Sequence, residues 1–300
     1  MRVTRTVAET RAALAALPRP LGFAPTMGAL HEGHLSLVEA AKARCASVAA
    51  SLFVNPTQFG RGEDLERYPR DEARDLELFA ARGVDVVFAP TADEMYPPGF
   101  ATLVHVGGPL TESLEGASRA SHFDGVCVIV AKLLGAVGPD VLFLGEKDAQ
   151  QLAVMRRMVR DLDLPVDVAG VPTVREPDGL AMSSRNAYLT AEERAQAPEL
   201  YLALRAGAAA AEQGAPADDI VAVAAMALVD PPEEVRSPIA ACVPQDIEYV
   251  AVVDADTFEQ HQTVGPRSLL VVALRLGRTR LIDNIALAPP SAYPAGDATV

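Results

Sequence analysis

The first part of the chain, up to residue 171, alternates short apolar runs with longer segments in which apolar residues recur at helical spacing. Five apolar runs predict buried strands, at residues 21–24, 48–54, 84–89, 141–144 and 166–171. Helical spacing predicts helices between these runs, at residues 34–44, 71–82, 125–137 and 149–162. Strands that alternate with helices in this way indicate βαβ units. We therefore expect a Rossmann-like, doubly wound parallel sheet in an α/β fold.

The pattern changes in the last third of the chain. A capping box formed by Thr190 and Glu193 opens an alanine-rich helical segment, which Pro198 is expected to interrupt. A further helix is predicted at 218–228, and the stretches IEYVAVVDADTF and SLLVVALRLGRTRLIDNI have the character of strands. This part therefore predicts a smaller α+β unit.

These patterns divide the chain into two predicted domains, at residues 1–173 and 174–300. The Pro-, Gly- and Ala-rich end, residues 288–300, is expected to be a disordered tail of the second domain. The first 23 residues have no long apolar segment and no small-residue cleavage site, so they predict a strand and an amphipathic helix rather than a signal peptide.

The charge of the chain limits its partners. A formal net charge of −14 at pH 7 argues against a nucleic-acid surface and against binding to an anionic membrane surface. The apolar runs are too short to span a bilayer. Three cysteines, Cys45, Cys127 and Cys242, lie far apart and form no CxxC pair, which fits buried thiols in a reducing cytoplasm.

The stretch PTMGALHEGH, at residues 25–34, places His31 and His34 where a predicted strand becomes a helix. Gly33 lets a ligand approach the backbone closely, and N–H groups at a helix start attract anions. Two imidazoles at this place could donate hydrogen bonds to a phosphate and stabilise charge that develops on it. The alternative is a pair of surface histidines near a turn, which the preceding Thr-Met-Gly makes less attractive.

Two later clusters offer further phosphate ligands. In GEKD, Lys147 follows a predicted strand and could cover phosphate oxygens, while Asp148 could accept a hydrogen bond from a ribose hydroxyl. In MSSRN, two serines and Arg185 lie on a loop that could close on a phosphate. Either cluster alone could also be an ordinary solvated turn.

A third group of side chains suits a small polar ligand. Asn55 and Gln58 follow a predicted strand in FVNPTQFG, and SRASHFDGV adds Arg119 and His122 before a predicted helix. Lys132 lies in the apolar segment VIVAKLLGAV, where it either extends to the surface or points at a ligand.

HxGH together with a later Met-Ser-Ser-Arg resembles the paired HIGH and KMSKS elements of class I adenylyl-transfer enzymes. The complete set of motifs points to a narrower family. PTMGALHEGH, FVNPTQF, YPR, HFDGV, GEKDAQQL, VPTVREPDGLAMSSRN and TRLIDNI, in this order, are similar to the pantothenate synthetase (pantoate–β-alanine ligase) family. The resemblance extends over nearly the whole chain.

The resemblance implies a ligase that joins pantoate to β-alanine through a pantoyl adenylate, using ATP with Mg²⁺ and releasing AMP and pyrophosphate. It implies a cytoplasmic homodimer whose N-terminal domain binds nucleotide and pantoate and whose C-terminal domain closes over ATP. A plain nucleotidylyltransferase and a non-enzymatic adenine-nucleotide-binding protein are the alternatives.

The resemblance also implies roles for individual residues. The catalytic residues would be His34, as proton donor, with His31, Lys147 and Arg185. The residues expected to bind ATP are Met27, Gly28, Ala29, Leu30, His31, Glu32, Gly33, His34, Gly145, Glu146, Lys147, Asp148, Val174, Met182, Ser183, Ser184 and Arg185. For pantoate and β-alanine, the resemblance implies Gln58 and Gln151 as ligands, and the polar clusters described above add Asn55, Arg119 and His122 to the expected substrate site. No Mg²⁺ ligand set is implied, and Asp75 is only a candidate.

Overall fold

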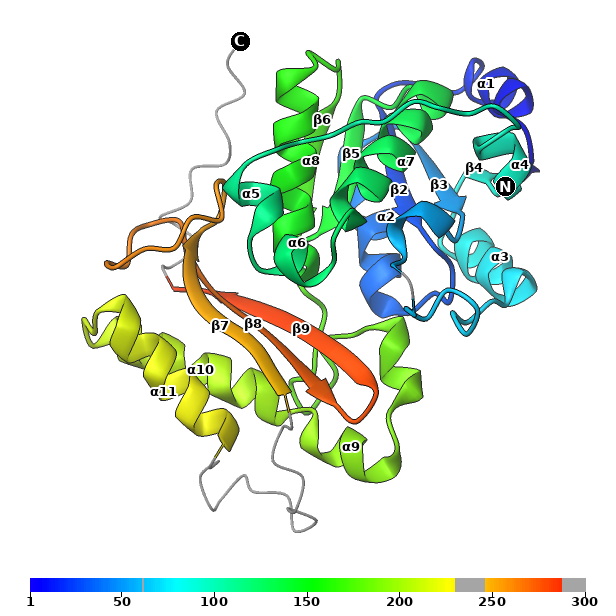
Figure 1. Cartoon of the computed structure of the whole chain (residues 1–300). Helices are drawn as coiled ribbons and strands as arrows, with labels where there is room; N and C mark the ends of the chain where they lie inside the picture. The colour runs from blue at the N-terminus through cyan, green and yellow to red at the C-terminus, as the bar shows by residue number, and fades with distance from the viewer. Residues whose placement is uncertain (61, 230–245, 288–300) are drawn as a thin grey trace. The chain divides into compact units, whose positions relative to one another are not determined.

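Six parallel strands form the main sheet of the protein, in the order β1-β4-β3-β2-β5-β6 (Figure 1). The computed structural model describes residues 1–60, 62–229 and 246–287. The strands are β1 (Arg2–Thr4), β2 (Leu21–Thr26), β3 (Ser47–Leu52), β4 (Val86–Phe88), β5 (Val141–Gly145) and β6 (Asp167–Val171). This sheet confirms the predicted α/β fold with parallel strands.

The strand order places β2 at the point where the direction of winding reverses. From β2 the chain continues outward through β3 to β4, and it later returns to β5 on the other side of β2. Ligands in open parallel sheets bind at the carboxyl ends of the strands that flank such a reversal. The segments PTMGALHEGH and GEKD begin within the last residues of β2 and β5 and continue beyond them, so each lies at the carboxyl end of its strand.

Helices connect these strands. They are α1 (Val7–Leu14), α2 (Glu32–Arg44), α3 (Glu72–Ala81), α4 (Ala92–Met95), α5 (Pro109–Glu112), α6 (Glu115–Ser118), α7 (His122–Val137) and α8 (Ala149–Asp161), with short 3-10 turns η1 (Pro56–Gln58) and η2 (Glu146–Asp148). Within the part of the chain that the structure describes, no helix is both long and apolar enough to cross a membrane.

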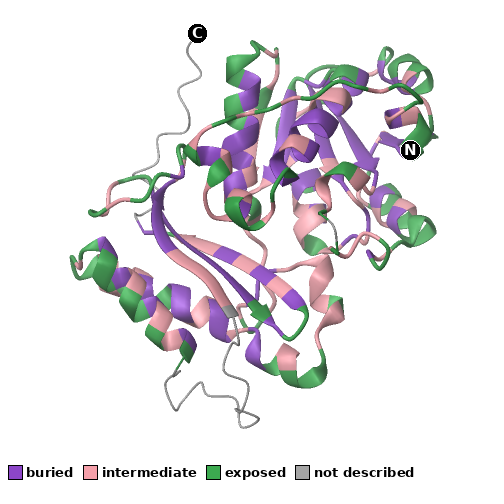
Figure 2. Ribbon diagram, viewed as in Figure 1, coloured by how far each residue is buried: buried purple, intermediate pink, exposed green. Residues whose placement is uncertain are grey.

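The core of this sheet follows from the alternation of side chains along each strand. Leu35, Val38 and Ala41 of α2 are at most 1% exposed and pack against Ala24 of β2 and Phe143 of β5. Neighbouring residues of a strand point to opposite faces. Figure 2 shows that the central strands are buried over most of their length, as expected for a sheet covered on both faces.

A second, smaller sheet is antiparallel, in the order β7-β8-β9. Its strands are β7 (Asp246–Asp254), β8 (Ser268–Leu276) and β9 (Thr279–Ala286). The helices α10 (Glu199–Glu212) and α11 (Ala217–Val229) lie across one face of it (Figure 1). Leu204, Ile220 and Leu270, each at most 1% exposed, join these helices to the sheet in one apolar core.

The chain divides into two compact units. Unit 1 comprises residues 1–146 and 154–174, and unit 2 comprises residues 147–153 and 175–300. Residues 147–153, which the sequence analysis placed in the first domain, thus cluster with the second unit. The predicted tail at 288–300, and Cys242, lie outside the described residues.

Several element boundaries differ from those predicted. The strand β2 continues through Pro25 to Thr26, whereas the prediction ended it at residue 24. It pairs with β5 only at Gly22 and Phe23, so Pro25 lies where β2 has a neighbour on one side alone, and a proline is tolerated there. Pro198 does interrupt the helical segment: α9 (Ala191–Gln196) ends before it and α10 begins after it.

Candidate active site

The turn that follows β2 is anchored by a buried carboxylate. Asp75, on α3, is 2% exposed, and its two oxygens accept the backbone N–H groups of Ala29 at 2.8 Å and Leu30 at 2.9 Å. Gly28 and Ala29 both have positive φ, at 87° and 51°. A non-glycine residue in this region is strained, and it persists only when its surroundings hold it there. Asp75 supplies that restraint.

We expect Asp75→Asn to lower the free energy of unfolding by about 3 kcal/mol, because an amide offers one acceptor oxygen where two N–H groups need one each in a buried site. Urea denaturation measures the change. Asp71→Asn is the matched control: Asp71 caps α3 by accepting the N–H of Arg74 at 3.1 Å, and asparagine caps equally well, so the same substitution changes stability by less than about 0.5 kcal/mol there. Equal losses in the two variants would contradict the anchoring role.

The two histidines stand together at the start of α2. His31 is its N-cap, and its Nδ1 accepts the N–H of Gly33 at 3.1 Å. The neutral ring therefore carries its proton on Nε2. The rings of His31 and His34 lie 4.0 Å apart between centroids, at an interplanar angle of 35°. The pattern HxGH thus brings both imidazoles to one place, as the sequence predicted.

The backbone at this helix start offers less to an anion than we expected. The N–H of Gly33 is used by His31, and the N–H groups of His34 and Leu35 both donate to the carbonyl oxygen of His31. The groups at this helix start that could donate to an anion are therefore mainly the imidazoles rather than the backbone.

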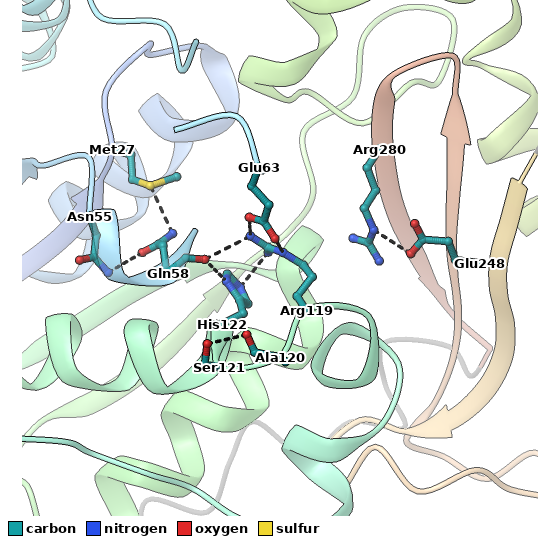
Figure 3. Close-up of polar contacts among 10 residues, drawn as sticks. All are labelled: Met27, Asn55, Gln58, Glu63, Arg119, Ala120, Ser121, His122, Glu248 and Arg280. Atoms are coloured by element: carbon teal, nitrogen blue, oxygen red, sulfur yellow. Dashed lines mark hydrogen bonds and ion pairs between the residues drawn. The ribbon is translucent and has the colours of Figure 1, made fainter. Parts of the chain in front are cut away.

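A second cluster surrounds Gln58 (Figure 3). Asn55, 1% exposed, donates from Nδ2 to Gln58 Oε1 at 3.0 Å and to the Gly125 carbonyl at 3.0 Å, and its Oδ1 accepts the hydroxyl of Tyr96 at 2.7 Å. Gln58 Nε2 lies 3.2 Å from Met27 Sδ. The amide of Asn55 is thus bonded to protein groups on both sides, and through one of these bonds it orients Gln58, a task that the sequence analysis did not assign to it.

The helix α7 approaches the turn η1 unusually closely. A Cβ at Gly125 would lie 2.4 Å from the carbonyl oxygen of Thr57 and 2.6 Å from the backbone nitrogen of Gln58. Only glycine fits against a backbone at this distance. The glycine of HFDGV is therefore what lets α7 support the turn that carries Gln58.

Arg119 and His122 support the same turn through their side chains. Arg119 donates to both oxygens of Glu63, at 2.9 and 2.6 Å, and to the Gln58 carbonyl at 3.4 Å (Figure 3). It also lies 3.0 Å from His122 Nε2, which must accept because arginine only donates. His122 Nδ1–H then donates to the Gln58 carbonyl at 2.9 Å. Both side chains therefore hold the backbone of Gln58, a task that the sequence analysis did not assign to them.

Burial, followed by the charge of Arg119, lowers the pKa of His122 from 6.5 to about 4. As pH falls, the unfolded chain takes up this proton first, so stability is present above pH 6.5 and is lost toward pH 4. We expect the wild type to lose about 2 kcal/mol more unfolding free energy than His122→Gln between pH 7 and pH 5. Urea titrations at both values test this. Parallel pH curves for the two proteins would show that His122 does not set this dependence.

In unit 2, Lys147 and Asp148 form part of the short turn η2. The side chain of Lys147 is 19% exposed, and its Nζ lies 3.8 Å from Asp148 Oδ1. Gln151 follows on the first turn of α8 and is half-buried, whereas its neighbour Gln150 is buried, so the two glutamines point in different directions as predicted from helical geometry.

The MSSRN segment leads into an ordered 3-10 turn, η3 (Ser184–Tyr188). Ser183 is its N-cap, and its hydroxyl accepts the N–H of Arg185 at 3.3 Å. Asn186 donates to Glu176 at 3.1 Å and to the Ala181 carbonyl at 3.1 Å. Ser183 therefore has a structural task at the start of this turn.

The residues described here do not form a protein cage for Mg²⁺. No group of three or more His, Cys, Asp or Glu side chains within residues 1–60, 62–229 and 246–287 is arranged to hold a metal ion. Asp75, the candidate from sequence, uses both oxygens on backbone N–H groups. Lys132, whose role was open, lies with Nζ 5.0 Å from the centroid of the Phe100 ring.

A family model described as pantoate-beta-alanine ligase matches residues 2–286. The chain belongs to the pantoate–β-alanine ligase family. The match spans both the histidine pair after β2 and the strand β9, so both units are parts of one family architecture.

Individual members of the pantoate–β-alanine ligase family are similar over almost their whole length. Pantothenate synthetase of Chloroflexus aggregans is 52% identical over 285 residues, which cover 95% of this chain and 99% of that protein. The crystal structure of pantothenate synthetase from Thermus thermophilus is 49% identical, with a TM-score of 0.89, and the match covers 96% of this chain and 100% of that one. The pantoate-beta-alanine ligase of Francisella tularensis, complexed with beta-gamma ATP and beta-alanine, is 31% identical, with a TM-score of 0.75 and 96% and 98% coverage.

Sequence reasoning about this ligase family member missed the residues that hold others in place. Tyr96 and Glu63 lie outside every cluster singled out from sequence, yet they bond directly to Asn55 and Arg119. Neither the MYPPG stretch around Tyr96 nor the acidic GEDLE stretch around Glu63 gives a sign of such contacts. Their partners become visible only when the chain folds.

Proposed function

We propose that this chain condenses pantoate with β-alanine to form pantothenate, using ATP and passing through a pantoyl adenylate. The observation that carries the proposal is the pair of imidazoles, 4.0 Å apart between ring centroids, at the carboxyl end of the central strand β2. Membership of the pantoate–β-alanine ligase family and the resemblance to proteins named pantothenate synthetase support the choice of substrates.

In the first proposed step, a carboxylate oxygen of pantoate attacks the α-phosphorus of ATP. The bond from that phosphorus to the oxygen leading to the β-phosphate breaks, and pyrophosphate leaves with the electron pair. Negative charge develops on the phosphates during this step, so hydrogen-bond donors fixed in advance lower its barrier. His34, the Nε2–H of His31, the ammonium of Lys147 and the guanidinium of Arg185 are the donors we assign.

In the second proposed step, the amine nitrogen of β-alanine attacks the acyl carbon of the adenylate. The bond between that carbon and the AMP oxygen breaks, AMP leaves, and the nitrogen loses a proton as the amide forms. Gln58 is the pantoate ligand we assign in unit 1, since its side chain is oriented by Asn55 and its backbone by Arg119 and His122. Gln151 of unit 2 is the second proposed pantoate ligand.

Three further parts belong to the proposal. Mg²⁺ would enter on the phosphate oxygens of ATP, which are the hard oxygen ligands that it prefers, and we derive no step through it. The protein would act as a homodimer, and light scattering of the purified chain tests this. The reaction would take place in the cytoplasm.

Pantoate-dependent exchange between ATP and labelled pyrophosphate tests the first step, and mass spectrometry of the products after addition of β-alanine tests the second. We expect exchange that requires pantoate, followed by pantothenate and AMP. A stable adenylylated product that ignores the amine would identify a nucleotidylyltransferase instead. ATP binding without any release of pyrophosphate would identify a nucleotide-binding protein.

A further inference from the structure

Two adjacent residues of β9, Asp283 and Asn284, hold the two segments of unit 2 that carry the proposed ATP ligands. One segment is the turn η2, with Lys147. The other is the hairpin at residues 175–181, which leads directly into Met182–Arg185. All of these residues belong to unit 2, and their contacts are described within it.

Asp283 anchors the hairpin through a buried ion pair. Its carboxylate, 2% exposed as a residue, accepts from Arg175 Nη1 at 2.5 Å and from Nη2 at 3.0 Å. Arg175 also donates to the Gly179 carbonyl at 3.1 Å and lies 3.9 Å from the centroid of the Tyr201 ring. A bidentate pair with this burial fixes both partners in one geometry.

The hairpin in turn fixes the loop that follows it. Arg175 and Ala181 form an antiparallel bridge, and the N–H of Glu176 donates to the Leu180 carbonyl at 2.8 Å. The side chain of Glu176 then accepts from Asn186 at 3.1 Å and from Arg194 at 2.5 Å. A continuous chain of contacts therefore leads from Asp283 to both ends of the MSSR segment.

Asn284 holds the other segment. Its Nδ2 donates to the backbone carbonyl of Lys147 at 3.0 Å, and its own carbonyl accepts from Arg175 Nη2 at 3.3 Å. The backbone N–H of Asn284 also donates to Asp283 Oδ1 at 2.8 Å. The turn that presents Lys147 is thus bonded to the same two residues that anchor the hairpin.

We propose that Asp283 and Asn284 are positioning residues that set the spacing between Lys147 and the MSSR segment, and so the affinity for the triphosphate of ATP. The inference rests on the proposed function. Neither residue needs to contact ATP. Each acts through a group that does, and small displacements of such groups have large effects on binding and rate.

Asp283→Asn and Asn284→Asp test the inference without changing side-chain size. The first removes one of the two carboxylate oxygens that bind Arg175, and the second replaces the N–H donor to Lys147 by an acceptor. We expect each to raise the KM for ATP about tenfold and to slow adenylate formation. The KM values for pantoate and β-alanine, and the rate of amide formation from pre-formed pantoyl adenylate, should stay within about twofold of wild type.

Asp256→Asn is the matched control, because Asp256 pairs with Arg267 at 2.5 Å at an exposed site of the same unit. It should leave every parameter unchanged. A merely structural role for Asp283 and Asn284 would lower the active fraction, so both half-reactions would fall together and the KM for ATP would not move. That result, or an unchanged KM for ATP in both variants, overturns the inference.

Two measurements keep the outcome separate from the proposed function. If Asp283→Asn does not fold, the half-buried Asn284→Asp decides the question alone. If the wild type shows no pantoate-dependent exchange, the proposed function fails, and calorimetric dissociation constants for ATP then replace KM. In that case a loss of affinity of about tenfold in the variants still supports the positioning role, and equal affinities overturn it.

Discussion

Replacing His34 by alanine is expected to slow the formation of pantoyl adenylate about 100- to 1,000-fold, the range observed when one preorganised donor to a developing oxyanion is removed. The centroid of the His34 ring lies 4.0 Å from that of His31 at the start of α2, where charge on the phosphates would need a donor. ATP binding should weaken much less, because the interaction strengthens as the transition state forms. Single-turnover release of pyrophosphate measures the rate, and calorimetry measures the affinity.

His261→Ala is the control for this experiment. His261 lies in the loop after β7, 39% exposed at its side chain and 3.7 Å from Asp254, so the same truncation should leave both the rate and the affinity unchanged. Should His34→Ala form pantoyl adenylate at the wild-type rate, the assignment of His34 as a donor to the phosphates is wrong. If His34→Ala also lowers the free energy of unfolding, the slower rate would instead be explained by a loss of stability in α2.

Replacing Lys147 by alanine is expected to slow adenylate formation about 100-fold or more, since its ammonium would face a phosphate that leaves in that step alone. Amide formation from pre-formed pantoyl adenylate should remain within about threefold of wild type, because no pyrophosphate is present. The two half-reactions are measured separately by rapid quench. The carbonyl of Lys147, which Asn284 binds, is unchanged by the substitution.

Lys42→Ala provides the comparison. Lys42 is 44% exposed at its side chain and lies 4.0 Å from Glu39 on the surface of α2, so its loss should affect neither half-reaction. Equal slowing of both steps by Lys147→Ala would contradict the assignment to the leaving phosphate. It would indicate instead that Lys147 binds AMP or maintains the turn η2.

Periodicity was sufficient to predict the fold, because the strands and helices of unit 1 are regular and separated by clear turn residues. It failed where an element depends on a distant neighbour. The strand β2 continues past Pro25 because Ser51 of β3 pairs beside it. The helix α7 begins at His122 rather than at residue 125, because Arg119 and the Gln58 carbonyl hold its first turn.

The parts of the candidate site also differ in whether they depend on local geometry or on distant neighbours. The motif HxGH predicted the imidazole pair, since both rings come from one helix start and depend only on local geometry. The tasks of Asn55, Arg119 and His122 could not be predicted, because each is decided by a partner at least 41 positions away in the chain, which is Tyr96 for the first and Gln58 for the other two. Residue type indicated a polar cluster, but it did not show which of its side chains bond to other parts of the protein.

The close approach of α7 to η1 limits how the surroundings of Gln58 can change. Where Gly125 meets the carbonyl of Thr57, one main chain rests on another, and no side chain can be trimmed to widen the space. If Gln58 binds pantoate as proposed, redesign for a bulkier acid begins at Met27, which borders Gln58 through a flexible thioether. Gly125 itself cannot be replaced, because any side chain there would clash with the main chain of η1.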